Sequence, residues 1–306
     1  MPLVQPVQAA ALRPLGVGDV LDRTFTVYRS KPLVFIGLSA IWYLLLVLVF
    51  VALAVGVFAG ALAAFVRQAT TPSPEQIAGA AVGIIGFVLI AVVVAILAFA
   101  AQSASLVYAA SRRYLAKDAA IGESFRAGLS AATRLFLAGV LVFLAIVGLW
   151  AVLLIVAALT NQGLAFVVAI LAAIVATAYL GCSWLVAPVV VVVEKMGPVA
   201  ALGRAWGLSG GNRWRIFGIQ ILLFILNIVL SLLIGGLFGG LVAAGGQGGA
   251  PGQFGVTSVV QSLVNLASTI IWAPVEWIAF TVLYYDLRVR KEAFDLQLAA
   301  EALPQS

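Results

Sequence analysis

Three long stretches of this chain contain no charged side chain, and a fourth contains only one. The uncharged stretches are residues 32–66, 76–111 and 135–193, and residues 216–285 are interrupted by Glu276 alone. A helix that crosses a bilayer needs about 20 consecutive apolar residues, so these stretches hold one, one, two and two helices. The sequence therefore predicts an all-α integral membrane protein with six transmembrane helices.

The composition excludes an ordinary soluble fold. Of 306 residues, 64% are hydrophobic and 9% are charged, whereas about 25% of the residues in a soluble protein are charged. We expect a membrane domain over residues 33–285, between an N-terminal arm (1–32) and a C-terminal helical tail (286–306). The six spans are predicted at 33–66, 77–110, 135–159, 163–193, 216–245 and 256–285.

The basic residues are distributed asymmetrically between the two ends of the predicted spans. The arm, residues 111–134, residues 194–215 and the tail hold 16 of the 17 Lys and Arg residues, and the other side holds only Arg67. Positively charged loops stay in the cytoplasm, so we expect both termini there. Arginine outnumbers lysine thirteen to four, which is typical of GC-rich bacteria, so the expected location is the bacterial cytoplasmic membrane.

A short amphipathic segment precedes each odd-numbered span. Its apolar side chains recur at helical spacing: Val17, Leu21, Phe25 and Tyr28 in the arm, Ile121, Phe125, Leu129 and Ala132 in the first basic loop, and Val199, Leu202 and Trp206 in the second. Such segments are typical of helices that lie in the membrane interface, with basic groups toward anionic headgroups. They predict three units of interfacial helix plus helical hairpin. The alternative is that loops between spans are amphipathic without forming a repeat.

The residue types that usually carry catalysis are missing. The chain has no histidine, which removes the commonest general base and the commonest metal ligand. Its single cysteine, Cys182, has no charged neighbour in the sequence that would favour a thiolate. We therefore expect no enzyme, no metal and no cofactor. The net charge of +6 is explained by the basic loops, so no nucleic-acid partner is expected.

Glu276 is the most informative residue inside a predicted span. An acidic residue at that depth costs about 2.5 kcal/mol or more, and it is by default a functional candidate. Ser262, Asn265 and Thr269 share a helix face with it. The fifth span carries a second polar line, which consists of Gln220, Asn227 and Ser231.

Three interpretations of these two polar lines stay open. The side chains hold the helices together by hydrogen bonds, they line a path for a solute or a proton, or they contact a lipid headgroup or a partner protein. Pro274 and Pro188 favour kinks in the helices that carry them, as transport sites often require. We expect Glu276 to face the bundle interior, against Asn227 or Ser231.

Charges of opposite sign alternate along the start of the tail. Three pairs stand four residues apart: Asp286 with Arg290, Arg288 with Glu292, and Lys291 with Asp295. Each such pair stabilises a helix by a few tenths of a kcal/mol. We therefore expect the last span to continue as a helix through residues 286–299, either as a stable cap or as a site for partners.

Both ends of the chain also carry recognisable motifs. The N-terminal sequence LRPLGVGDVLDRTFTVYR and the C-terminal sequence LYYDLRVRKEAFDL resemble the bacterial membrane-protein family named after the membrane domain of glycerophosphodiester phosphodiesterases. The resemblance covers essentially the whole chain. For some relatives it implies an appended TIM-barrel enzyme with a metal site and catalytic histidines. Because this chain has no histidine, we expect the membrane part without that activity.

Together these patterns favour a non-enzymatic scaffold or accessory subunit. Such a protein would engage membrane lipids or other membrane proteins through its cytoplasmic interfacial helices and tail. The alternative function is a small-solute or lipid transporter with Glu276 in its pathway.

Overall fold

The computed structural model describes residues 14–66, 73–160, 162–244 and 256–301. Within these residues the chain forms helices and no strands. The helices are α1 (Val17–Ser30), α2 (Pro32–Val66), α3 (Pro74–Tyr114), α4 (Ile121–Leu159), α5 (Gly163–Trp184), α6 (Ala187–Val193), α7 (Pro198–Ser209), α8 (Arg213–Ala244), α9 (Val256–Glu292) and α10 (Phe294–Glu301).

The prediction of six membrane-spanning helices is confirmed. Six helical segments among the described residues are long and apolar enough to cross a membrane: α2, α3, α4, α5 with α6, α8 and α9. The fourth is broken, because α5 ends at Trp184 and α6 begins at Ala187, one residue before Pro188. A proline removes an amide donor and clashes with the preceding turn. By contrast, Pro274 lies inside α9 without ending it.

Two of the three predicted amphipathic segments form separate short helices, α1 and α7. The third does not, because residues 121–132 are the first turns of the long helix α4. Only Thr133 and Arg134 separate this segment from the predicted span at residue 135, and no proline intervenes. A charged residue limits how deep a helix enters the bilayer, but it does not end the helix. The three-unit repeat is therefore present in two units as predicted and altered in the third.

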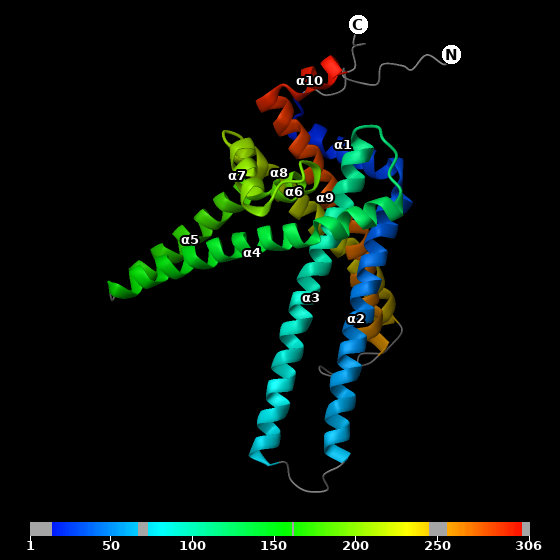
Figure 1. The fold of residues 1–306 in the computed structure, drawn as a ribbon, viewed down its shortest axis with the longest axis vertical. Helices are drawn as coiled ribbons and strands as arrows, with labels where there is room; N and C mark the ends of the chain where they lie inside the picture. The colour runs from blue at the N-terminus through cyan, green and yellow to red at the C-terminus, as the bar shows by residue number, and fades with distance from the viewer. Residues whose placement is uncertain (1–13, 67–72, 161, 245–255, 302–306) are drawn as a thin grey trace.

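The helices diverge from one charged end (Figure 1). We define the charged end as residues 14–31, 111–123, 193–215 and 286–301, which include α1, α7 and α10. The α2 and α3 helices extend away from this end side by side, with α8 and α9 beside α2, whereas the α4–α5 hairpin extends in a clearly different direction. The apolar side chains of that hairpin are mostly exposed, as expected for surfaces that contact lipid.

The core lies next to the charged end, around the last turns of α9. Every residue from Ile278 to Leu287 is buried, including Tyr284 and Tyr285. A helix that is buried on all sides lies in the centre of its bundle. Accordingly α9 contacts α1, α2, α3, α6, α7, α8 and α10.

The α3 and α4 helices meet at a close crossing beside this core. A Cβ atom on Gly128 would lie 1.9 Å from the Ser105 Oγ and 2.4 Å from the Ala101 carbonyl oxygen, so only glycine fits there. The indole of Trp42 donates a hydrogen bond of 3.1 Å to the same Ser105 hydroxyl and stacks on Phe125. This contact fixes α4 against both α2 and α3.

Candidate functional site

The charged end is held together by three networks of ion pairs, and the first is centred on Asp286. Its side chain is fully buried and accepts hydrogen bonds from the Leu15 amide at 2.7 Å, from Arg290 Nε at 3.0 Å and from Arg215. Both arginines also donate to the Leu15 carbonyl oxygen. The N-terminal arm, α8 and α9 are therefore joined at one backbone position.

The second network joins α6, α7 and the end of α9. Arg204 on α7 pairs with Glu194 at 3.1 Å and also with Glu292, and Arg288 pairs with Glu292 at 3.0 Å. The Tyr284 hydroxyl donates a hydrogen bond of 2.6 Å to Glu194. Hydrogen bonding to Glu292, with Glu194 adding to it, raises the pKa of Arg204 above its ordinary value, so this guanidinium stays charged.

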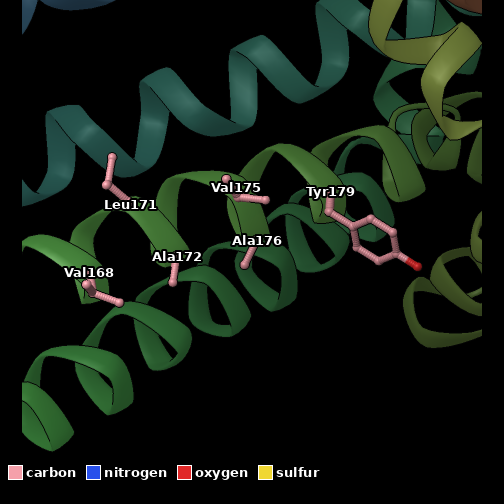
Figure 2. A pocket seen from close by; sticks show the side chains of 6 residues that line it. All are labelled: Val168, Leu171, Ala172, Val175, Ala176 and Tyr179. Atoms are coloured by element: carbon pink, nitrogen blue, oxygen red, sulfur yellow. The ribbon is translucent and has the colours of Figure 1, made fainter. Parts of the chain in front are cut away.

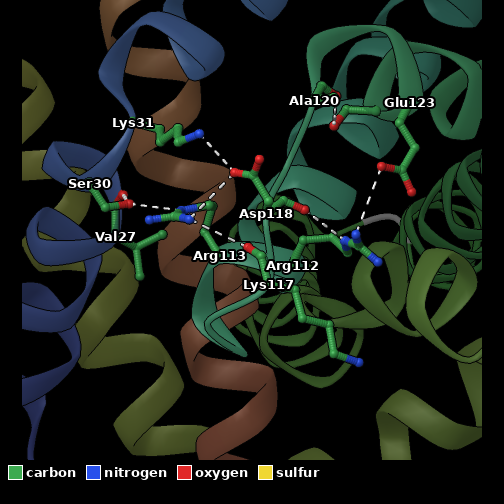
Figure 3. Close-up of polar contacts among 10 residues, drawn as sticks. Val27, Ser30, Lys31, Arg112, Arg113, Lys117, Asp118, Ala120 and Glu123 are labelled. Carbon is green, nitrogen blue, oxygen red and sulfur yellow. Dashed lines mark hydrogen bonds and ion pairs between the residues drawn. The ribbon is translucent and has the colours of Figure 1, made fainter. Parts of the chain in front are cut away.

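The third network joins the α1–α2 junction to the α3–α4 turn (Figure 3). Lys31 Nζ donates a hydrogen bond of 2.8 Å to Asp118, and Arg113 lies 3.8 Å from the same carboxylate. Arg113 also donates to the Ser30 hydroxyl, at 3.1 Å. The hydrogen bond from Lys31 lowers the pKa of Asp118. The Asp118 side chain is 75% exposed, unlike that of Asp286.

The predicted tail is correct in part. The Asp286–Arg290 and Arg288–Glu292 pairs are formed, but α9 ends at Glu292 instead of continuing to residue 299. Ala293 has a positive φ of 50°, and the chain restarts as α10. The third predicted pair, Lys291 with Asp295, spans this break and is not formed, because its residues no longer share one helical register.

The tail charges do more than the sequence pattern predicts. Asp286 and Glu292 bind Arg215 and Arg204, neither of which was a predicted site residue. The separations of these contacts along the chain, such as 271 residues between Leu15 and Asp286, exceed any local spacing rule. The only feature of the sequence that could have indicated these arginines is their position at the ends of predicted spans.

Glu276 lies in a polar pocket between α8 and α9. Gln220, Asn227 and Glu276 line a pocket of about 340 Å³ together with apolar neighbours that include Trp272. The Tyr43 side chain of α2 also lies within electrostatic range of Glu276. Three residues of the two predicted polar lines therefore line one pocket.

The remaining polar residues of the two lines do not join this pocket. Ser231, Ser262, Asn265 and Thr269 are exposed. The Thr269 hydroxyl donates to the Asn265 carbonyl oxygen of its own helix, at 2.8 Å, which is the usual way a helical hydroxyl finds an acceptor. A side chain satisfied in this manner needs no partner on the neighbouring helix, so helical spacing alone overstated the contact.

A third feature, absent from the sequence prediction, is an apolar groove between α5 and α8 that ends at Arg213. The groove encloses about 500 Å³. It is lined by Ile174, Val175, Ala178, Tyr179, Cys182, Arg213, Trp214 and Phe217. Arg213 stands at the start of α8. A basic residue at that position indicates the end of a span in the sequence, but it does not indicate the groove.

Within the described ranges, no three His, Cys, Asp or Glu side chains are grouped to hold an ion. No family model, no curated protein and no solved structure matches this chain.

Proposed function

We propose that this chain is a non-enzymatic membrane protein of the bacterial cytoplasmic membrane, with both termini in the cytoplasm. In this proposal it is a scaffold or accessory subunit that engages lipids or partner proteins through the charged end. It also belongs, in this proposal, to the family that its two end motifs resemble.

The observation that carries the proposal is the interlocking of the charged end. Three ion-pair networks tie the arm, the α3–α4 turn, α7, α8 and α9 to one another, and part of this charge is buried. A surface whose side chains are already fixed loses less entropy when a partner binds. Exposed basic residues such as Lys117, Arg126 and Lys195 remain on its outside, where they favour acidic partners or anionic headgroups.

The orientation is tested by cysteine labelling in intact cells. In a Cys182→Ser background, cysteines at positions 117 and 199 should resist an impermeant thiol reagent, and a cysteine at position 75 should react. Positions 117, 199 and 75 are all exposed in the structure, so protection reports the side of the membrane. Labelling at 117 and 199 but not at 75 would contradict this orientation and indicate the reverse one.

The scaffold function is tested by comparing what co-purifies with matched variants from native membranes. Reversing Lys117 and Arg126 to Glu should remove bound partners or lipids, because it alters the exposed charge of the proposed surface. The Glu75→Lys variant changes an exposed charge at the opposite end of α3 and serves as the control. An unchanged inventory in the Lys117 and Arg126 variant contradicts a role for the charged end.

A second candidate function, transport, is favoured by the pocket at Glu276. A carboxyl group that shares a pocket with two amides is suited to holding a proton or a cation inside the membrane. A further buried polar side chain lies on α3, where Gln102 is 4% exposed.

Glu276 variants separate the two functions. A scaffold predicts that Glu276→Gln keeps both folding and partner binding. A transporter predicts that the same variant folds but loses flux, which a pH-sensitive dye in proteoliposomes under a potassium diffusion potential reports for protons. The Glu276→Leu variant is the control for packing, because leucine removes the polar group that shares the pocket with Gln220 and Asn227, and it should be less stable than the Gln variant.

A further inference from the structure

Among the described residues, Arg213 contacts two aromatic rings and a hydroxyl but has no acidic partner. Its guanidinium carbon lies 4.6 Å from the centre of the Tyr179 ring and 4.7 Å from the Trp206 ring. Its Nε donates a hydrogen bond of 2.7 Å to the Ser183 hydroxyl. Among the residues that the structure describes, no carboxylate lies within 4.0 Å of it. The two Nη groups of a fixed positive charge are therefore left for another acceptor.

The groove that begins at Arg213 is apolar and continues along α5. Beyond Tyr179 it becomes a shallow channel on the surface of the helix. Figure 2 shows its lining side chains in a row along α5: Val168, Leu171, Ala172, Val175, Ala176 and Tyr179. The stretch from Val168 to Tyr179 is about 16 Å long at 1.5 Å per residue. Its apolar lining suits an extended hydrocarbon chain.

The indole of Trp214 marks the depth of this site in the membrane. Trp214 is 87% exposed and stands between Arg213 and Arg215 at the start of the apolar helix α8. Exposed tryptophan is enriched at the level of lipid headgroups. Arg213 thus stands at headgroup depth, and the groove leads from it toward the acyl region.

We propose that this groove binds one anionic phospholipid, with its phosphate on Arg213 and an acyl chain along α5. A planar guanidinium is suited to two parallel hydrogen bonds to phosphate oxygens, and the aromatic rings keep it in that orientation. The lipid's net negative charge neutralises a guanidinium that the described part of the chain leaves unpaired. This inference rests on the proposed function, since it names the lipid class that the protein engages.

The test uses the full chain, delipidated in a neutral detergent and titrated with phosphatidylglycerol or with phosphatidylcholine of the same acyl chains. Native mass spectrometry counts the bound lipid. The wild type should bind phosphatidylglycerol in preference to phosphatidylcholine. Arg213→Gln should weaken phosphatidylglycerol binding roughly tenfold to a hundredfold. Glu75→Gln, which changes an exposed charge at the opposite end of α3, should leave the binding unchanged.

Two further arms keep the result interpretable. Ala178→Trp fills the groove and leaves the arginine itself in place, and Ala178 is exposed, so it should weaken lipid binding while leaving the thermal unfolding of the protein unchanged. Arg213→Lys keeps the charge and loses the planar fork, so its affinity should fall between those of wild type and Arg213→Gln. Inorganic phosphate distinguishes a site for the headgroup alone from a site for the whole lipid. It should compete only weakly with phosphatidylglycerol, and Ala178→Trp should not change the binding of phosphate itself.

Several outcomes would overturn the proposal. They are wild-type affinity in a folded Arg213→Gln variant, equal binding of the two lipids, or an Ala178→Trp variant that binds phosphatidylglycerol normally. The failure of this site is distinguishable from failure of the scaffold function. Arg213→Gln leaves the Asp286 and Glu292 networks intact, so partners recovered through Lys117 and Arg126 would persist while the lipid is lost.

Discussion

Replacing Asp286 by asparagine should destabilise the protein far more than the same change at Asp118. Both aspartates bind two basic side chains, but the Asp286 side chain is fully buried and the Asp118 side chain is 75% exposed. Asparagine keeps an acceptor for the Leu15 amide and removes the negative charge. The loss of stability in Asp286→Asn therefore measures how much the buried negative charge contributes to the free energy of unfolding.

The expected magnitude follows from the exposure of the two arginines. The Arg290 side chain is 30% exposed and can turn toward water, whereas that of Arg215 is 17% exposed and remains as a poorly solvated charge. Breaking a buried pair by removing one partner costs about 3–5 kcal/mol. We expect Asp286→Asn to lie at the lower end, at about 3 kcal/mol, because only one arginine is trapped. Asp286→Ala should cost about 1–3 kcal/mol more, since the buried Leu15 amide also loses its acceptor.

The measurement is the free energy of unfolding in mixed detergent micelles, followed by far-UV circular dichroism. Asp118→Asn should be indistinguishable from wild type, because exposed pairs contribute little. The double variant Asp286→Asn with Arg215→Gln should be less destabilised than the sum of the single variants. Equal stability of Asp286→Asn and Asp118→Asn would refute the reasoning.

Three further predictions concern other parts of the charged end and the helices next to it. Gly128→Ala should lower stability by about 1–3 kcal/mol by overpacking the α3–α4 crossing, whereas Gly139→Ala, where a Cβ meets nothing within 4 Å, should leave the melting temperature unchanged or raise it. Ala293→Gly should stabilise the protein by up to about 1 kcal/mol, because glycine adopts the positive φ without strain, and the same unfolding titration measures this. The ¹³C carboxyl signal of Asp118 should titrate below the ordinary value of about 3.9; its contribution to stability is present above the unfolded pKa and is lost as pH falls through the lower folded pKa. Lys31→Gln should move that titration upward, and an unshifted midpoint in the wild type would contradict the pairing.

The number and type of helices could be predicted because bilayer thickness sets the length of an uncharged stretch. The same reasoning failed to predict where helices end, because backbone hydrogen bonding determines the end of a helix. Arg134 did not end a helix, so the segment from Ile121 merged into α4. Ala293 did end one, although nothing in its own residue type favours a positive φ.

The candidate sites were predictable only where a residue is unusual for its surroundings. Glu276 could be identified because a carboxylate in an apolar stretch is costly, whereas helical spacing grouped it with Ser262, Asn265 and Thr269, which do not line its pocket. Arg204, Arg213 and Arg215 carry no such signal, since basic residues are expected at the ends of spans. Their roles depend on which helices pack together, and that packing lies outside the reach of local patterns.

The hydrogen bond between the Leu15 amide and Asp286 also sets an order of events during synthesis. Asp286 is made 271 residues after Leu15, so at about 5–20 residues per second the arm waits roughly 15–50 seconds for its anchor. During that interval the Leu15 amide and carbonyl are available to water, and the first helices enter the membrane without the contact that later joins both ends. The contact that joins the two ends of the chain therefore forms only when the last span arrives, and a chain that stops short of Asp286 leaves Leu15 without its acceptor.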